Sequence, residues 1–206
     1  MFPHRHKRPR HEISGLSPSP TESSTQLLAQ QVLDALAEHD VVGSMVRVVD
    51  HDVRPGVQLD MSDGDEWPRI RQQIMDSDIL LIATPTWMGQ HSSVCQRAFE
   101  RLDAELSEKD EQGRLQTYGK VGIVAVVGNE DGAHHISAVA FQCLNEVGFT
   151  IPAGGVTYWN GEAMHSTDYK DLDTTPETVT STTTSLAANA AHLATVLRAS
   201  AYPPAG

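Results

Sequence analysis

The sequence predicts a single α/β domain whose parallel β-sheet carries helices on both faces. Short apolar segments alternate with longer segments of helical periodicity, which is typical of such a sheet. Two of the short segments, residues 79–83 and 121–127, are continuously apolar, as expected for central strands buried on both sides. Each is followed by a polar loop that contains glycine, and parallel sheets bind ligands beyond the carboxyl ends of their strands.

Five helices are expected from apolar residues that recur three and four positions apart. They cover residues 24–39, 68–75, 93–106, 131–147 and 175–197. Pro68 suits the first turn of the second helix. The other four helices start at residues whose side chains can cap a helix N-terminus, namely Ser24 or Thr25, Ser92 or Ser93, Asp131, and Thr175.

The remaining strands are predicted at residues 45–49 and 149–151, with the second resuming near Val156. The domain is expected to span residues 14–199. An irregular or disordered basic tail precedes it at residues 1–13, and a frayed tail follows at residues 200–206.

Composition narrows the range of partners. The formal net charge is −12, which argues against nucleic-acid binding because that function needs a basic surface. The apolar runs are shorter than a membrane span, and the basic N-terminus has no apolar segment typical of a secretory signal, so a cytoplasmic protein without a membrane partner is expected. Cys95 and Cys143 lie on apolar helical stripes and are expected to be reduced core thiols.

The sequence lacks the motifs of several common classes of enzyme and binding protein. It has neither the G-x-G-x-x-G dinucleotide fingerprint nor a P-loop, since residues 113–120 have the wrong spacing. The G-x-S-x-G elbow of α/β-hydrolases is missing as well. The ten histidines form no metal-binding pattern, so no metal is expected.

Three segments resemble the flavodoxin-like, NAD(P)H-dependent FMN reductases. They are ATPTWMGQ at 83–90, VGNEDGAH at 127–134 and IPAGGVTYWNGE at 151–162. The resemblance extends over about residues 16–198. It implies a doubly wound five-stranded sheet in the order 2-1-3-4-5, with FMN as a non-covalent cofactor and NAD(P)H as the electron donor.

The resemblance places the FMN phosphate at the N-terminus of the first helix. A phosphate is favoured there because hydroxyl and N–H donors combine with the helix dipole. The hydroxyls are supplied by Ser17, Ser19, Ser23, Ser24 and Thr25. A plain polar connector ending in a helix cap is the alternative for this segment.

The flavin ring needs a flat apolar wall and hydrogen-bond donors at its pyrimidine edge. The first wall is assigned to Pro85, Thr86, Trp87, Met88 and Gly89. Trp87 offers a stacking face, although it could instead fold onto the surface.

The donor loop is assigned to Gly128, Asn129, Glu130, Asp131 and Gly132, since donors near the ring stabilise its reduced anionic form. The Glu130 side chain is expected to point away from that negative charge.

Two features of the chain leave alternatives open. Tyr158, Trp159 and Asn160 could cover the ring or the substrate, or serve core packing or an oligomer interface. The segment expected to form the first strand, residues 8–15, is charged and contains Pro9, whereas central strands exclude proline. Either this strand forms badly, or the arrangement differs, or the start of the reading frame is misplaced.

The leading functional hypothesis is an FMN-dependent oxidoreductase that passes electrons from NAD(P)H to flavin or quinone-like small-molecule acceptors. In this class the cofactor supplies the chemistry, so no catalytic acid–base pair is expected. The alternatives are a flavodoxin-type electron carrier and a non-catalytic domain with impaired FMN binding. Homo-oligomerisation is compatible with each.

Overall fold

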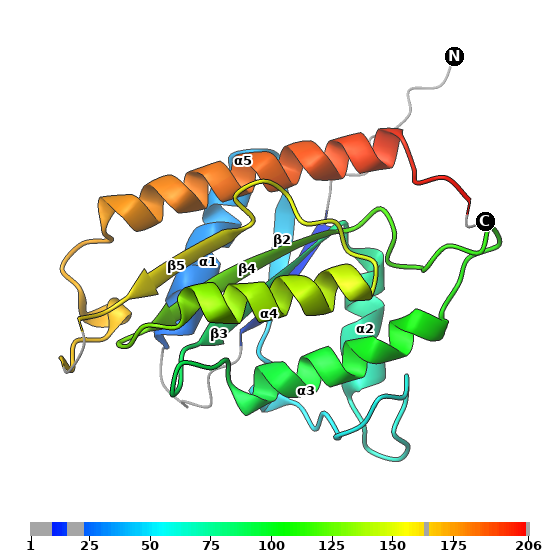
Figure 1. Cartoon of the computed structure of the whole chain (residues 1–206), viewed down its shortest axis with the longest axis horizontal. Helices are drawn as coiled ribbons and strands as arrows, with labels where there is room; N and C mark the ends of the chain where they lie inside the picture. Colours follow the sequence, from blue (N-terminus) through cyan, green and yellow to red (C-terminus); the bar gives the residue numbers. More distant parts are fainter. Residues whose placement is uncertain (1–9, 16–22, 163–164, 205–206) are drawn as a thin grey trace.

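The computed structural model describes residues 10–15, 23–162 and 165–204. Five parallel strands form one sheet in the order β2-β1-β3-β4-β5, which confirms the predicted flavodoxin-like order (Figure 1). The strands are β1 (Arg10–Gly15), β2 (Val42–Val46), β3 (Ile79–Pro85), β4 (Val121–Gly128) and β5 (Val156–Asn160).

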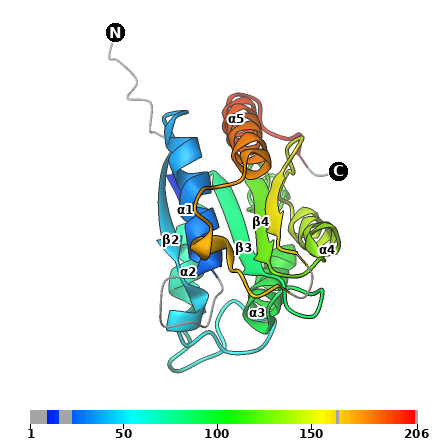
Figure 2. The ribbon, with the colours of Figure 1, turned by 90° about the vertical axis from the view of Figure 1, so that its left-hand side faces the viewer.

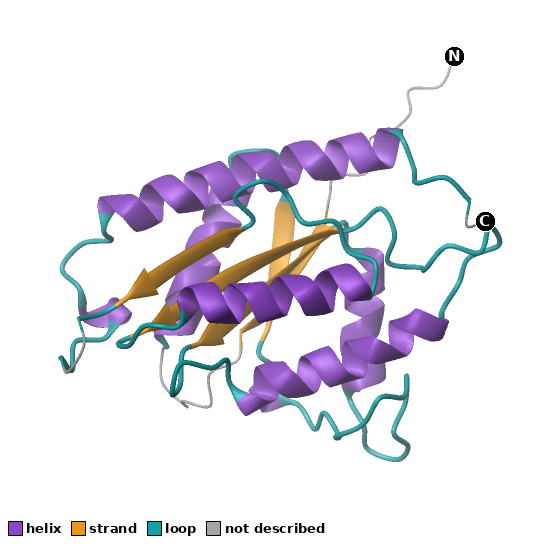
Figure 3. Cartoon of the chain, in the orientation of Figure 1, coloured by secondary structure: helices purple, strands orange, loops and turns teal. Residues whose placement is uncertain are grey.

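Helices cover both faces of this sheet, which lies between them in Figure 3. Five α-helices and three 3₁₀ helices occur in the described residues: α1 (Ser24–Ala37), α2 (Trp67–Asp76), α3 (Ser93–Leu102), α4 (Ala133–Glu146), α5 (Glu177–Ala199), η1 (Val48–Asp50), η2 (Asp103–Ser107) and η3 (Tyr169–Asp171). Helices α1 and α5 pack on one face, and α2, α3 and α4 pack on the other (Figure 2). Among the described helices, none has the length and apolar character needed to cross a bilayer.

The two helical layers enclose two separate hydrophobic cores. Along β3, Ile79 and Leu81 face the core under α1 and α5, whereas Leu80 and Ile82 face the core under the other three helices. This alternation is the period-two geometry of a strand. Because both of its faces are covered, β3 is buried along its whole length, as its continuously apolar sequence predicts.

The charged segment near the N-terminus does form an interior strand of the sheet. Strand β1 pairs in parallel with β2 and with β3, so that Ile13 lies between Met45 and Leu81 in register. The expectations of a badly formed strand and of a different arrangement are therefore wrong. Residues 10–13, which the sequence assigns to a tail, belong to this strand, and Pro9 lies outside the described residues.

Two predicted strands are shifted in the structure. Strand β2 comprises residues 42–46 rather than 45–49, because Val48 buries its side chain from the 3₁₀ helix η1 instead of from the sheet. Residues 149–151 contribute only an isolated bridge between Thr150 and Val121, and β5 begins at Val156.

The predicted helix ends need correction at the N-terminal caps of α1, α4 and α5 and at the C-terminus of α3. Asp131 does not cap α4, because Gly132 occupies the N-cap position. Thr175 does not cap α5, which starts after Pro176; its hydroxyl accepts a hydrogen bond from Gln31 in α1 instead. The third helix ends at Leu102 and continues as η2.

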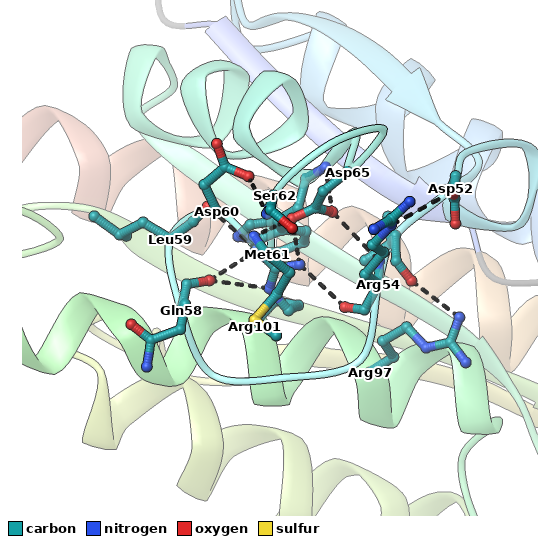
Figure 4. A network of polar contacts seen from close by, with 12 residues as sticks. Asp52, Arg54, Gln58, Leu59, Asp60, Met61, Ser62, Asp65, Arg97 and Arg101 are labelled. Atoms are coloured by element: carbon teal, nitrogen blue, oxygen red, sulfur yellow. Dashed lines mark hydrogen bonds and ion pairs between the residues drawn. The ribbon is translucent and has the colours of Figure 1, made fainter.

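The guanidinium of Arg101 in α3 holds the long loop between η1 and α2 (Figure 4). It is fully buried, donates to the Asp65 carboxylate at 2.7 Å, and donates to the backbone carbonyls of Arg54 and Gln58 at 3.0 and 2.8 Å. Desolvation raises the pKa of Asp65, but hydrogen bonds from the Met61 N–H and from Arg101 outweigh it. The pKa of this carboxyl is therefore below its usual value of 3.8.

Candidate functional site

A pocket of about 550 Å³ opens at the carboxyl ends of β3 and β4. Figure 2 views the molecule from this end of the strands. Four segments that are far apart in the sequence line the pocket. Its described lining residues are Ser23, Ser24, Thr25, Pro85, Thr86, Trp87, Val127, Gly128, Asn129, Glu130, His165, Asp168 and Lys170.

The N-terminus of α1 forms the first wall. Ser23 is the N-cap, and its hydroxyl oxygen accepts from the N–H of Gln26 at 3.1 Å, so the cap lies one residue before the predicted Ser24 or Thr25. The first turn of α1 contains no acidic residue, and its partial positive charge faces the pocket without a carboxylate of its own turn. Ser17 and Ser19 lie outside the described residues.

The loop after β3 forms the second wall. Trp87 and Gln90 exchange two backbone hydrogen bonds of 2.8 and 3.0 Å, which close a tight turn. At its tip, Met88 and Gly89 have φ values of 53° and 71°. Trp87 lines the pocket at its mouth with 44% of its surface exposed, whereas Met88 is 91% exposed and points into solvent. Of the five residues predicted here, Met88 and Gly89 are absent from the described lining.

The loop after β4 forms the third wall and touches the second. A Cβ atom on Gly128 would lie 2.6 Å from the Cβ of Thr86, and one on Gly132 would lie 2.9 Å from the Cα of Gly89. Glycine is needed at both places because the loop after β4 lies against the Thr86 side chain at Gly128 and against the Gly89 backbone at Gly132. Asp131 and Gly132 are absent from the described lining, and Gly132 contributes to the site through its packing against Gly89.

Glu130 connects the same two loops. Its carboxylate accepts a 2.6 Å hydrogen bond from the backbone N–H of Met88, while the residue also lines the pocket. A second link joins His135 in α4 to Gln90, with 2.9 Å between the ring Nε2 and the amide Oε1. The loops after β3 and β4 are thereby fixed relative to each other.

Thr86 contributes an unpaired hydroxyl to the pocket wall. The residue is 4% exposed, and its Oγ1 has no hydrogen-bond partner among the described residues. A buried hydroxyl without a partner costs about 1–3 kcal/mol, a cost that a polar ligand group would remove. The pocket thus combines a helix N-terminus that lacks an acidic residue in its first turn with a buried hydroxyl that has no partner among the described residues.

A fourth wall comes from the connection between β5 and α5. Its His165, Asp168 and Lys170 line the pocket, although sequence reasoning did not select them. The side-chain amide of Asn129, in the third wall, donates to Asp168 at 3.0 Å. This hydrogen bond connects the fourth wall to the third. The available signal was the length of this polar connection, since long loops in compact domains are often functional.

The aromatic residues of β5 are absent from the described lining. The Tyr158 hydroxyl lies 3.0 Å from Nε2 of His134 in α4, and the Trp159 ring packs against Tyr169 with 5.4 Å between centroids. Each side chain therefore packs against the helical layer on its own face of the sheet. The geometry favours the core-packing alternative over a cover for the ring.

Both cysteines are free thiols, as the apolar stripes predict. Cys95 is fully buried in α3 and Cys143 is half-buried in α4. Burial raises the pKa of the Cys95 thiol well above its ordinary value. Cys95 is therefore a core residue rather than a nucleophile.

Comparison with known proteins points to flavin enzymes. The family profile described as NADPH-dependent FMN reductase matches residues 12–163. The crystal structure of RosB with bound 8-demethyl-8-formylriboflavin-5'-phosphate superimposes with a TM-score of 0.82 at 28% identity, covering 94% of this chain and 81% of that chain.

Two curated relatives are longer than this chain. One is the 8-demethyl-8-aminoriboflavin-5'-phosphate synthase of Streptomyces davaonensis, 30% identical over 154 residues, which are 70% of this chain and 60% of that protein. The other, from Mycobacterium bovis, is named divalent metal cation transporter MntH and is 36% identical over 193 residues, which are 90% of this chain and 28% of that protein. The chain thus spans less than two thirds of either relative.

The family match covers most of the described sheet together with the loops after β3 and β4. The chain belongs to the NADPH-dependent FMN reductase family, a family of flavodoxin-like, FMN-dependent oxidoreductases.

Proposed function

We propose that this chain binds FMN in the four-walled pocket and passes electrons from NAD(P)H to a small-molecule acceptor of the flavin or quinone type. The observation that carries the proposal is the meeting of a hydroxyl-rich helix N-terminus with the unpaired Thr86 hydroxyl and the Trp87 ring in one pocket. When bound, FMN accepts a hydride and passes on electrons.

The protein's residues would bind and orient the cofactor. Ser23, Ser24 and Thr25 would hold the phosphate at the positive end of α1. The Trp87 ring would stack on the flavin, and the Thr86 hydroxyl would gain a hydrogen-bond partner. Backbone N–H groups of the loop at residues 128–130 would face the pyrimidine edge. Glu130 would keep that loop and the Trp87 loop in register through the Met88 N–H.

A visible-absorbance titration with FMN tests the binding step. Saturable binding at micromolar FMN supports the proposal, and the absence of any flavin band rules out both the enzyme and the electron carrier. Oxidation of NADH and NADPH is then followed with and without a quinone. Turnover that needs the quinone supports the oxidoreductase, while binding without turnover favours the carrier.

The similarity to RosB favours a second candidate, in which a flavin phosphate is the substrate rather than the resident cofactor. The RosB structure holds a formylated riboflavin phosphate. Mass spectrometry of the flavin recovered after turnover separates the two roles. Unchanged FMN supports the cofactor role, and a flavin of altered mass supports the substrate role.

A further inference from the structure

The fourth wall of the pocket contains a short strap, residues 168–171, that joins two other walls. At one end, Asn129 donates to Asp168 at 3.0 Å. At the other end, the backbone N–H of Lys170 donates to the Ser24 hydroxyl at 3.2 Å. The strap thus crosses from the loop after β4 to the N-terminus of α1, as Figure 2 also shows.

Tyr169 anchors the strap on α1. Its side chain is 2% exposed, and its hydroxyl donates to the Gln31 side chain at 2.6 Å. The same Gln31 side chain donates to the Thr175 hydroxyl at 2.9 Å. The ring of Trp159 packs beside the Tyr169 ring. This anchoring fixes the backbone of the next residue, Lys170, at the pocket.

Lys170 is the only lysine or arginine among the described residues that line the pocket. The nearby carboxylates of Glu130 and Asp168 are both engaged with N–H donors, from Met88 and Asn129 respectively. The Lys170 ammonium lies 3.9 Å from Asp171, in a pair whose side chains are 35% and 57% exposed. A pair of this length and exposure is weak and leaves the ammonium able to contact a second anion.

Lys170 and the N-terminus of α1 line the same pocket. Because the first turn of α1 has no acidic residue, the helix dipole favours an anion there. A phosphate bound at this terminus would also attract the Lys170 ammonium. In the same pocket, the residue Thr86 is 4% exposed and its Oγ1 has no hydrogen-bond partner among the described residues, so a polar ligand group would supply the missing partner.

We propose that Lys170 binds the 5'-phosphate of the flavin and makes the pocket selective for phosphorylated flavins over riboflavin. This inference rests on the proposed function. Selectivity follows because an unphosphorylated flavin leaves the Lys170 ammonium and the Ser23 and Ser24 hydroxyls without their anion.

Fluorescence titrations of FMN and riboflavin against the wild-type protein and the variants K170M, K170R and K109M test the proposal. Lys109 is the matched control, because this exposed lysine precedes β4, whereas the pocket opens at the carboxyl end of that strand, and Lys109 is not among the described lining residues. In K170M we expect the Kd for FMN to rise about tenfold, since a hydrogen bond to a charged group is lost, with the Kd for riboflavin unchanged. K170R should keep most of the FMN affinity, and K109M should match the wild type. Added salt should weaken FMN binding to the wild type more than to K170M.

Failure of this inference is distinct from failure of the proposed function. If the wild type binds neither flavin, the proposed function is wrong and the inference falls with it. If the wild type binds FMN and riboflavin equally, or if K170M loses both or neither, the proposed function stands and the role of Lys170 is refuted. Thermal unfolding of each variant shows whether an equal loss reflects a damaged fold.

Discussion

At the scale of single residues, Thr86 stands out because it is buried in the pocket wall without a hydrogen-bond partner in the described part of the chain. Its neighbour Thr84 is equally buried, yet its hydroxyl donates to the Pro85 carbonyl and accepts from the Ser92 N–H. Two threonines of one strand end thus differ in a single respect. The Thr84 hydroxyl completes hydrogen bonds of the protein itself, whereas the Thr86 hydroxyl has no partner among the described residues.

Replacing each threonine with valine separates these roles. T84V should lower the free energy of unfolding by about 1–3 kcal/mol, because the Ser92 N–H loses its buried acceptor. T86V should leave that free energy unchanged or slightly raised, while the Kd for FMN increases about fivefold. Urea unfolding and FMN titration measure the two effects. A T86V protein that is less stable but binds FMN normally would assign Thr86 to the fold alone.

Trp87 provides a second test at the residue scale. Its ring is 44% exposed at the pocket mouth, so its removal affects a ligand more than the core. W87A should weaken FMN binding by about tenfold if stacking contributes about 1–1.5 kcal/mol, and W87F should retain most of the affinity. FMN titration measures both variants. Equal FMN affinity in W87A and the wild type would remove Trp87 from the site.

At the scale of elements, the loops after β3 and β4 behave as one unit because their backbones touch at Gly89 and Gly132. G132A combines a left-handed φ of 137° with a Cβ position 2.9 Å from the Gly89 Cα. We expect it to cost about 1–3 kcal/mol of unfolding free energy and to weaken FMN binding. G119A is the matched control, since Gly119 has a φ of 88° but open space around the new Cβ. If G119A lowers FMN affinity as much as G132A does, loop contact is not the cause.

The loop held by Arg101 gives an element-scale prediction about pH. Asp65 has a lowered pKa in the folded protein, so its contribution to stability is present above pH 3.8 and is lost as the pH falls through the folded value. D65N leaves Arg101 buried without its charge partner and should cost about 3–5 kcal/mol at pH 7. Urea unfolding between pH 7 and pH 3 should show this gap from the wild type narrowing as the pH falls. D63N, at an exposed position of the same loop, should change stability little at any pH.

Sequence patterns predicted the buried elements well and the exposed or charged ones poorly. Strands β3 and β4 were predictable because burial on both faces requires an apolar residue at almost every position. The boundaries of β2 could not be predicted in the same way, because an apolar side chain such as Val48 can reach the core from a 3₁₀ helix as well as from a strand. Strand β1 was obscured by its charges, although its backbone pairs on both sides.

The residues of the pocket were likewise predictable only where a local sequence pattern marks them. Its walls at α1, β3 and β4 were predictable because helix caps and strand ends have local sequence signals. The strap containing Lys170 was not predictable from local sequence, because it reaches the pocket through tertiary contacts with Asn129 and Ser24. Asp131 was misassigned as a cap because glycine with a positive φ takes that position where the loops meet.

For the whole molecule, the strand order places the pocket where the chain reverses direction across the sheet. Strand β1 leads to α1 on one face, and its neighbour β3 leads to α3 on the other. The crevice between these diverging connections is where open α/β sheets bind ligands. Both layers and the strap contribute to this one site, so ligand binding should stabilise the molecule as a whole.

Thermal unfolding with and without FMN tests this expectation. At an FMN concentration one hundred times its Kd, binding adds about 2.7 kcal/mol to the free energy of unfolding. For a chain of this size the midpoint should rise by about 5–10 °C. G132A should show a smaller shift at the same FMN concentration. A midpoint that FMN leaves unchanged would contradict binding to the folded state.

The strap also determines when the pocket is completed during biosynthesis. The hydrogen bond between Lys170 and Ser24 joins residues 146 positions apart, and the one between Gln31 and Thr175 spans 144. Contacts this distant in sequence close late, because the intervening chain must be synthesised and ordered first. An emerging chain that ends before residue 170 would hold α1 and β3 but would lack the lysine proposed to bind the phosphate. Cofactor capture would then be a late event of maturation, because it requires that residues 168–175 have already been synthesised.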